Sequence, residues 1–224
     1  MIFVMVDKNI QIANSVIQKE VEAMQKLQNC IDKNFIAAVK LIAKSKGRIL
    51  TSGIGKSGLI GRKVSACFAS IGIPSFSIHP VEAVHGDLGS FESDDILIAL
   101  SHSGNTEEMK NVVLYCKKHG IKSIGITSNR NSFLGKECDI AIVYDCKEEA
   151  IDGFPVPTTS CVLVLAICDA LTACAIKHRK ISQEQYGEWH SGGTIGRAMR
   201  RIVGKKKKEL NSMAQFNRVK NSKK

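Results

Sequence analysis

The segment Asp95-Ile-Leu-Ile-Ala-Leu100-Ser101-His102-Ser103-Gly104-Asn105-Thr106 is the most informative part of this chain about its fold. Its first half is a continuous apolar run, which is typical of a strand buried on both faces of a parallel sheet. Its second half is rich in hydroxyl groups and leads into a helical pattern over Glu107–His119, with Gly120 as the stop signal. We therefore expect a buried strand, a polar loop and a helix, in that order.

The same alternation of strand and helix continues on both sides of this stretch. Short apolar runs predict further strands at 48–52, 74–78, 123–127 and 139–143, and helical spacing predicts helices at 56–71, 158–177 and 182–188. Parallel strands joined by helices need right-handed crossovers. We therefore predict an α/β fold, a three-layer α/β/α sandwich with a five-stranded parallel sheet. Its ligand should lie beyond the carboxyl ends of the strands.

The chain outside this core divides into an N-terminal helical region and a basic C-terminal end. Residues 8–46 carry apolar positions three and four apart, which predicts one or two helices, broken near 29–34, lying over the rest of the domain. Hydrophobic residues make up 44% and charged residues 24%, which excludes a disordered or collagen-like chain. We expect a single domain over 1–203, with its N-terminal helices, and a basic tail over 204–224.

The distribution of charge and hydropathy along the chain indicates whether nucleic acid or a membrane is an expected partner. Of the net charge of +11, +10 falls on residues 197–224, where a solvated terminus explains it more simply than a polyanion site. Nucleic acid is therefore not an expected partner. The longest apolar run, 161–167, is too short to cross a membrane, and the first residues lack the basic segment of a signal peptide. We expect a cytoplasmic protein that does not bind membranes.

The eight cysteines show no metal-binding or disulfide pattern. None forms a C-x-x-C pair, and no Cys/His spacing fits a zinc site. We therefore predict reduced thiols and no metal.

The loop Gly53-Ile-Gly55-Lys56-Ser57-Gly58 follows the first predicted strand. It matches the G-x-G-x-x-G dinucleotide fingerprint, but no acidic residue ends the second strand, and a phosphate-binding P-loop would need a glycine at Leu50. Glycines at a helix N-terminus still let backbone N–H groups approach an anion. Gly55, Lys56 and Ser57 are therefore candidate anion contacts, and a tight turn with an exposed lysine is the alternative.

The loop Ser101–Thr106 carries the stronger signal. Three hydroxyl groups surround a glycine just before a helix, where the free N–H groups of the first turn attract anions. A simple N-cap, the alternative, needs one hydroxyl group rather than three. We predict a phosphate cradle formed by this loop.

Three further loops carry candidate polar groups. His85 lies beside Gly86 after the second strand, and His190 precedes two glycines after the last predicted helix. Glu148 and Glu149 follow the fifth strand, and Thr158 or Thr159 is expected to cap the long apolar helix. A structural histidine and a solvated acidic loop are the alternatives for these positions.

These loops, in this order, resemble the sugar-isomerase (SIS) family, and more closely its arabinose-5-phosphate isomerases of the Kdo-pathway and capsule type. The similarity rests on Gly53-x-Gly-Lys-Ser-Gly, His85-Gly-Asp87, Ser101-x-Ser-Gly104 and His190-x-Gly-Gly193, within a region from about Val21 to Arg197. The resemblance implies an aldose–ketose isomerase that interconverts ribulose 5-phosphate and arabinose 5-phosphate through an enediol. It implies no cofactor, and a homotetramer whose active sites take residues from neighbouring subunits.

The resemblance also implies which residues form the site. The catalytic set carried over is Lys56, His85, Glu108, His190 and Glu149. The substrate and phosphate set is Gly55, Ser57, Ser101, His102, Ser103, Thr106 and Thr158. This chain departs from the family pattern at His102, where Asn or Gln is usual, at Asn105, where many relatives carry Glu, and at Ser191, which replaces a common Pro.

Several alternatives stay open at this point. The substrate of an isomerase of this type could instead be a hexose or heptose phosphate. A module that binds a sugar phosphate without turnover is the rival from another class, although no helix-turn-helix pattern is visible. Longer family members carry a pair of CBS modules after this domain, and we expect none here.

Overall fold

The computed structural model describes residues 7–205, and the predicted basic tail lies outside the described residues except for 204 and 205. Five strands form one parallel sheet in the order β2-β1-β3-β4-β5. The strands are β1 (Ile49–Ser52), β2 (Ser75–Ile78), β3 (Ile96–Leu100), β4 (Lys122–Thr127) and β5 (Ile140–Val143). The predicted fold class and all five strands are confirmed, with each boundary within one residue of its prediction.

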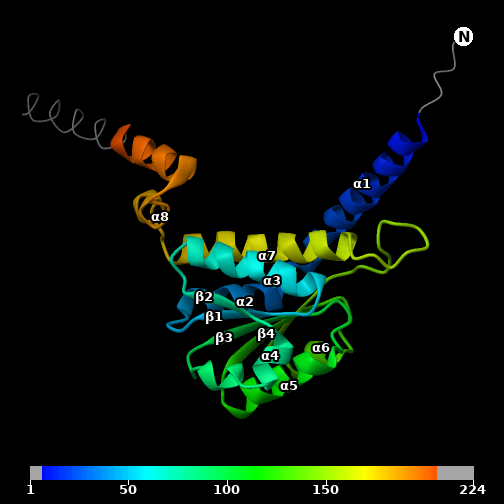
Figure 1. The fold of residues 1–224 in the computed structure, drawn as a ribbon, viewed down its shortest axis with the longest axis horizontal. Coiled ribbons are helices and arrows are strands. Elements are labelled where there is room, and N and C mark those ends of the chain that lie inside the picture. The colour runs from blue at the N-terminus through cyan, green and yellow to red at the C-terminus, as the bar shows by residue number, and fades with distance from the viewer. Residues whose placement is uncertain (1–6, 206–224) are drawn as a thin grey trace, which may run out of the picture.

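Helices cover both faces of the sheet (Figure 1). One face carries α2 (Lys33–Lys44), α3 (Lys56–Ser70) and α7 (Thr159–His178), and the other carries α4 (Pro80–Val84), α5 (Glu107–Lys118) and α6 (Phe133–Glu137). A short α8 (Gln183–Trp189) follows α7. The helices α4 and α6 fall in segments that the sequence did not predict as helical. The architecture is the predicted α/β/α sandwich.

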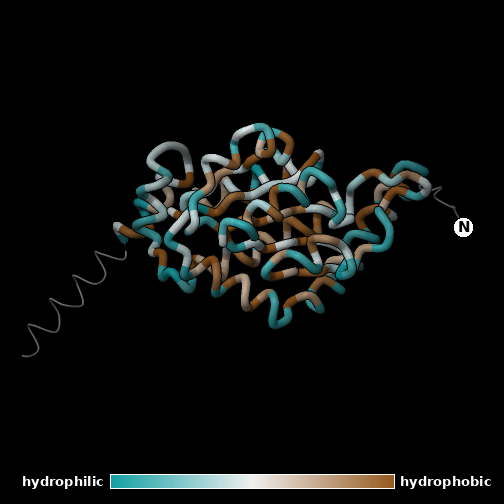
Figure 2. Tube along the Cα trace, turned by 90° about the horizontal axis from the view of Figure 1, so that it is seen from below, coloured by the Kyte–Doolittle hydropathy of each residue, from teal (hydrophilic) through white to brown (hydrophobic). Residues whose placement is uncertain are grey.

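The strands supply two separate hydrophobic cores. Ile98, Leu100 and Ile126 face α2, α3 and α7, whereas Leu97 and Ala99 face α4 and α5. All five residues of β3 are buried, as the apolar run predicted. Figure 2 shows hydrophobic segments of the trace in the middle of the body. The sheet is therefore a rigid central layer from which the loops at its carboxyl end project.

The helix α7 is the one described helix long and apolar enough to cross a membrane. In this structure it belongs to the core instead, with Leu163, Ile167 and Leu171 buried against the sheet. Its length matters for the site, because 20 residues of α-helix rise about 30 Å. The two ends of α7 therefore lie at opposite ends of the domain.

The N-terminal helix departs from its prediction. The expected break is present, with α1 (Lys8–Leu27) followed by a 3-10 turn (Gln28–Cys30) before α2. However, α1 does not lie over the domain. It extends away from the body, and only its last turns approach the core through Ala23 and Leu27 (Figure 1). Its apolar face, which includes Ile10 and Ile17, is exposed to solvent.

Candidate functional site

The two loops predicted to bind phosphate meet at one point on the sheet. In the strand order, β1 pairs with β2 on one side and with β3 on the other. The chain therefore leaves β1 and β3 toward helices on opposite faces, which opens a crevice beyond their carboxyl ends. The glycine loop after β1 and the serine loop after β3 border this crevice. Ligands of open parallel sheets bind at such points.

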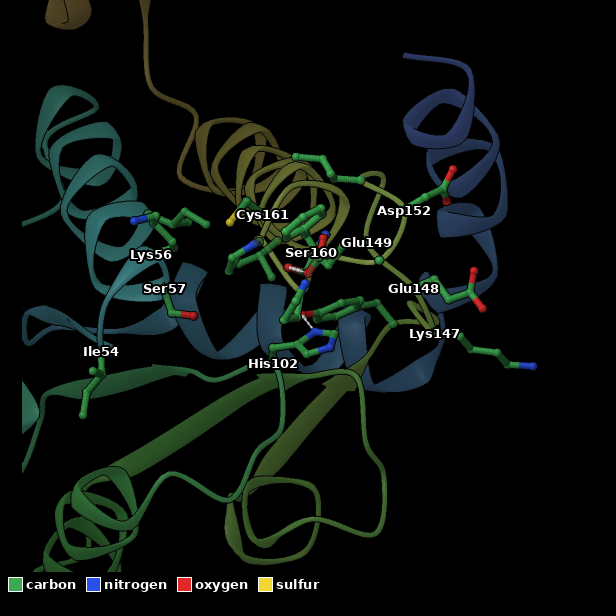
Figure 3. Close-up of a pocket in the computed structure, with 18 residues that line it drawn as sticks. Ile54, Lys56, Ser57, His102, Lys147, Glu148, Glu149, Asp152, Ser160 and Cys161 are labelled. Carbon is green, nitrogen blue, oxygen red and sulfur yellow. Dashed lines mark hydrogen bonds between the residues drawn. The ribbon is translucent and has the colours of Figure 1, made fainter. Parts of the chain in front are cut away.

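A cavity of about 500 Å³ lies at this edge of the sheet (Figure 3). Four of the predicted site residues line it, namely Lys56, Ser57, His102 and Glu149. The segment that follows β5 supplies much of the rest of the wall. Those residues include Tyr144, Lys147, Asp152, Phe154, Ser160 and Cys161. The structure thus brings together residues from the ends of β1, β3 and β5.

The glycine loop forms the start of α3. Gly55 adopts a φ of +59° immediately before the helix, a conformation that favours glycine. A Cβ atom at Gly58 would lie 2.6 Å from the carbonyl oxygen of Gly53, so these two positions are fixed by close backbone approach. The structure therefore contains the tight turn that was the alternative for this loop. The prediction that the loop contacts an anion depends on the side chains of Lys56 and Ser57. Lys56 also lines a second cavity of about 330 Å³, together with Gly55, Arg62 and His79.

The serine loop holds its own shape through its hydroxyl groups. Ser101 Oγ lies 2.9 Å from Thr106 Oγ1 and accepts a hydrogen bond from the Gly104 N–H at 3.1 Å. Ser103 Oγ accepts from the Asn105 N–H at 3.3 Å. Thr106 occupies the N-cap position of α5, yet its side chain makes no capping hydrogen bond. The simple N-cap therefore does not account for this loop, and the positive end of α5 remains free to face an anion.

Glu149 caps α7, which corrects the prediction that Thr158 or Thr159 does so. Its carboxylate accepts hydrogen bonds from the N–H groups of Thr158 at 2.8 Å and Ser160 at 3.1 Å, and from both of their hydroxyl groups. Burial alone would raise the pKa of Glu149, but these hydrogen bonds hold it below its usual value. The carboxylate, and not a threonine hydroxyl group, caps the helix because it can accept four hydrogen bonds. Thr158 Oγ1 also accepts from the Ala150 N–H at 2.9 Å.

Two of the predicted catalytic residues lie at the same edge but outside the cavity wall. Glu108 is in the first turn of α5 and is half-buried. His85 follows α4 and is exposed, and α4 packs against α5. Neither side chain is among the residues that line the cavity. They flank the serine loop from the opposite face of the sheet.

His190 lies at the other end of the domain. It follows α8, where its Nδ1 is 2.7 Å from the Tyr186 carbonyl oxygen and its ring stacks on that tyrosine. The adjacent Trp189 packs against Gly72, at the far end of α3 from Lys56. Because α7 spans about 30 Å between the cavity and α8, His190 cannot reach the cavity of its own chain.

Comparisons with known proteins agree with this architecture. The model of the SIS domain matches residues 41–173, which is more than half of the chain. The chain belongs to the SIS domain family. It is 38% identical over 192 residues to an uncharacterized protein of Rickettsia prowazekii, a match that covers 85% of this chain and 60% of that protein. It is 42% identical over 178 residues to arabinose 5-phosphate isomerase KpsF of Escherichia coli O6:H1, which covers 79% of this chain and 54% of KpsF.

A solved structure extends the comparison to three dimensions. A protein of Escherichia coli CFT073, solved in complex with arabinose 5-phosphate, superposes with a TM-score of 0.75 at 33% identity, covering 83% of this chain and all of that one. The chain spans little more than half the length of the curated relatives it matches. The SIS domain is thus the part that they share.

Several residues of the SIS domain's cavity were not predicted. Tyr144 lies directly after β5, and Ser160 and Cys161 are in the first turn of α7. The position after β5 is a signal that could have found Tyr144, because ligands of parallel sheets bind beyond the carboxyl ends of the strands. Among the described residues, no group of three or more His, Cys, Asp or Glu side chains could hold a metal ion.

Proposed function

We propose that this chain is an arabinose 5-phosphate isomerase, which interconverts D-arabinose 5-phosphate and D-ribulose 5-phosphate through an enediol. The observation that carries the proposal is the likeness to the Escherichia coli protein solved with arabinose 5-phosphate, whose whole length this chain matches. The KpsF and KdsD relatives support the same activity. We extend this to a role in the synthesis of Kdo for lipopolysaccharide or capsule, in the cytoplasm.

The chemistry needs an anchor for the phosphate and groups that move protons. The serine loop and the N-terminus of α5 offer hydrogen bonds and a positive dipole for the phosphate. Binding there holds the reacting carbons C1 and C2 in place, so that remote binding energy lowers the barrier. Ser57, Ser101, Ser103 and Thr106 are the proposed phosphate contacts, and Lys56 is the group proposed to stabilise enediolate charge.

Proton transfer is assigned to the carboxyl and imidazole groups around this anchor. A base removes the proton at C2 of the open-chain aldose, which the neighbouring carbonyl group acidifies, and the proton returns at C1 while a second group moves a proton from O2 to O1. We propose Glu108 or His190 as the main proton carrier, and His85 as the group that assists ring opening or proton relay. Glu149 supplies a fixed negative charge, because its pKa is held below the usual value.

The position of His190 supports a site shared between subunits. Since its own cavity lies a helix length away, His190 can act only in the site of another copy. The exposed apolar face of α1, with Ile10, Ile17 and Val21, offers a surface that a second copy can bury. We propose a homotetramer in which each cavity is completed by a neighbour's His190.

Direct turnover tests the proposed activity. The purified protein is incubated with arabinose 5-phosphate in deuterated water, and the product is followed by NMR. We expect ribulose 5-phosphate with deuterium at C1, because the enediol exchanges its proton with solvent. Saturable binding without ketose would instead indicate a sensor module. Neither binding nor turnover would reject the substrate, and hexose and heptose phosphates would be tested next.

Mixed oligomers test the shared site. His190→Ala and Glu108→Gln are each expected to abolish most turnover as pure proteins. When the two variants are co-expressed, we expect activity to recover, because some sites then receive an intact His190 beside an intact Glu108. A mixture no more active than either parent would contradict a site built from two copies.

Sedimentation of variants in α1 tests the proposed contact between copies. Ile17→Lys should lower the oligomeric state, whereas Lys8→Glu on the same helix should leave it unchanged.

A further inference from the structure

His102 is hydrogen-bonded to a buried tyrosine at the carboxyl end of the sheet. Its Nδ1 lies 3.0 Å from the hydroxyl oxygen of Tyr144, as the dashed line in Figure 3 shows. His102 follows β3 and Tyr144 follows β5, with β4 between the two strands. Both side chains line the cavity of about 500 Å³. The pair therefore forms one wall of the site.

The backbone of His102 is held as firmly as its ring. Its carbonyl oxygen accepts hydrogen bonds from the Ser128 N–H at 3.0 Å, from Ser128 Oγ at 2.8 Å and from Thr127 Oγ1 at 3.0 Å. These donors follow or end β4. The loop that carries His102 is thus tied to the neighbouring strand, and Tyr144 then fixes which way the ring points. A side chain that is already held in one orientation loses little conformational entropy when it binds a ligand.

The surroundings of Tyr144 fix the direction of this hydrogen bond. Its side chain is 1% exposed, and burial raises its pKa, so the phenol keeps its proton. Among the described residues, His102 Nδ1 is the hydrogen-bond partner of that hydroxyl group. A buried O–H group is nearly always paired, and it would be left unpaired if Nδ1 carried the proton. The hydroxyl group therefore donates to Nδ1.

A neutral imidazole carries one proton, so this arrangement leaves the proton on Nε2. We propose that Tyr144 is a positioning residue that holds His102 in the Nε2–H form, so that the ring donates this hydrogen to an oxygen of the bound sugar phosphate. The identity of the ligand rests on the proposed function, whereas the tautomer does not. His102 then determines affinity for the substrate, and the proton transfers of the reaction remain with other groups.

The tautomer can be measured without substrate. Nitrogen-15 NMR of histidine-labelled protein at a pH where His102 is neutral reports which ring nitrogen is protonated. We expect His102, assigned by comparison with His102→Ala, to be protonated at Nε2 in the wild type. In Tyr144→Phe we expect a mixture of both forms. Protonation at Nδ1 in the wild type, or no change in the variant, would overturn the proposal.

The second measurement separates positioning from a general loss of structure. Tyr144→Phe should raise the KM for arabinose 5-phosphate roughly three- to tenfold, the equivalent of one hydrogen bond, with kcat little changed. Tyr115→Phe is the matched control, because Tyr115 lies on α5, where it packs against Phe91 and His119 and does not line the cavity. The control should leave KM unchanged. In a His102→Ala background, Tyr144→Phe should have no further effect on KM, and an undiminished effect would contradict a role through His102.

Failure of the proposed function gives a different result from failure of this inference. If the wild type neither binds nor isomerises arabinose 5-phosphate, the substrate assignment is wrong. The NMR measurement then still decides whether Tyr144 sets the tautomer of His102. If the wild type is active but its His102 is protonated at Nδ1, the proposed function stands and this inference is rejected.

Discussion

The two ends of the same parallel sheet use their polar groups in opposite ways. At the amino end, Asp95 is 1% exposed and accepts hydrogen bonds from the N–H and Nε of Arg48, each at 2.9 Å, and from the Glu92 N–H. Asp139 similarly accepts hydrogen bonds from Lys122 Nζ at 2.8 Å and from the N–H and Oγ of Ser123. Burial opposes ionisation of both carboxyl groups, but these hydrogen bonds hold their pKa values below the usual range.

At the carboxyl end, Lys56, Ser57 and His102 line a cavity, and the hydroxyl groups of the serine loop lie beside His102 outside the cavity wall. Some of them bond to one another, yet the N-terminus of α5 and the Nε2 side of His102 remain available to a ligand. The fold therefore pairs its charged groups internally where strands begin and leaves polar groups open to a ligand where strands end. Stability and activity should therefore respond to mutations at different ends of the sheet.

The largest effect expected at the amino end is on stability. Asp95→Asn removes the charge that pairs with Arg48, and breaking a buried ion pair costs about 3 kcal/mol of unfolding free energy. Urea denaturation of the variant should show this loss, while turnover at low temperature stays near that of the wild type. Glu92→Gln is the control, because Glu92 is exposed and lies 3.5 Å from the same arginine. Loss of turnover without loss of stability would contradict the division between the two ends.

The corresponding change at the carboxyl end should affect turnover alone. Glu108→Gln keeps the shape of the side chain but cannot carry a proton, so we expect turnover to fall at least ~10²-fold, the usual contribution of a general base. Glu107→Gln is a matched control in the same helical turn, because Glu107 pairs with Lys110 at 2.7 Å on the surface. A near-wild-type rate for Glu108→Gln would reject Glu108 as the proton carrier.

Much of this fold can be predicted because its signals are local. The run 95–100 is apolar throughout, and β3 is buried throughout. The helices α4 and α6 were missed because five residues are too few to show a helical period. The apolar face of α1 was recognised, but a periodic pattern does not say what covers it. Figure 1 shows that α1 extends away from the domain, so the domain leaves most of this apolar face uncovered.

The site residues that could be predicted from the sequence are those that lie together in one loop. Lys56, Ser57 and His102 lie in glycine- or serine-rich turns, and the cavity contains all three. Tyr144 follows a strand end as the predicted loops do, but its hydrogen bond to His102 depends on β5 lying two strands from β3 in the sheet, which the sequence does not give. His190 was predicted from a motif, but its distance from the cavity follows only from the length of α7.

Glu149 is an exception to this division, because it lies at the carboxyl end of the sheet yet is hydrogen-bonded like the aspartates of the amino end. Glu149→Gln removes the charge of this helix cap and one of its two accepting oxygens, and should cost about 1 kcal/mol of stability at pH 7. The pKa of Glu149 is lowered on folding, so its contribution is present above the unfolded value near 4.5 and is lost as the pH falls through the folded pKa. Urea denaturation at a series of pH values should therefore show the wild type and the variant converging in acid. A constant difference down to low pH would contradict an ionised cap.

The smallest effect should come from a pair that belongs to neither end. Lys63 on α3 pairs with Asp169 on α7, and the two side chains are 43% and 58% exposed. Water and salt screen such a pair, so Lys63→Met should change the unfolding free energy by no more than about 0.5 kcal/mol and should leave turnover unchanged. Raising the salt concentration should reduce even that difference. A loss as large as that of Asp95→Asn would mean that bonding between helices, and not burial at the sheet's amino end, decides which charges stabilise this domain.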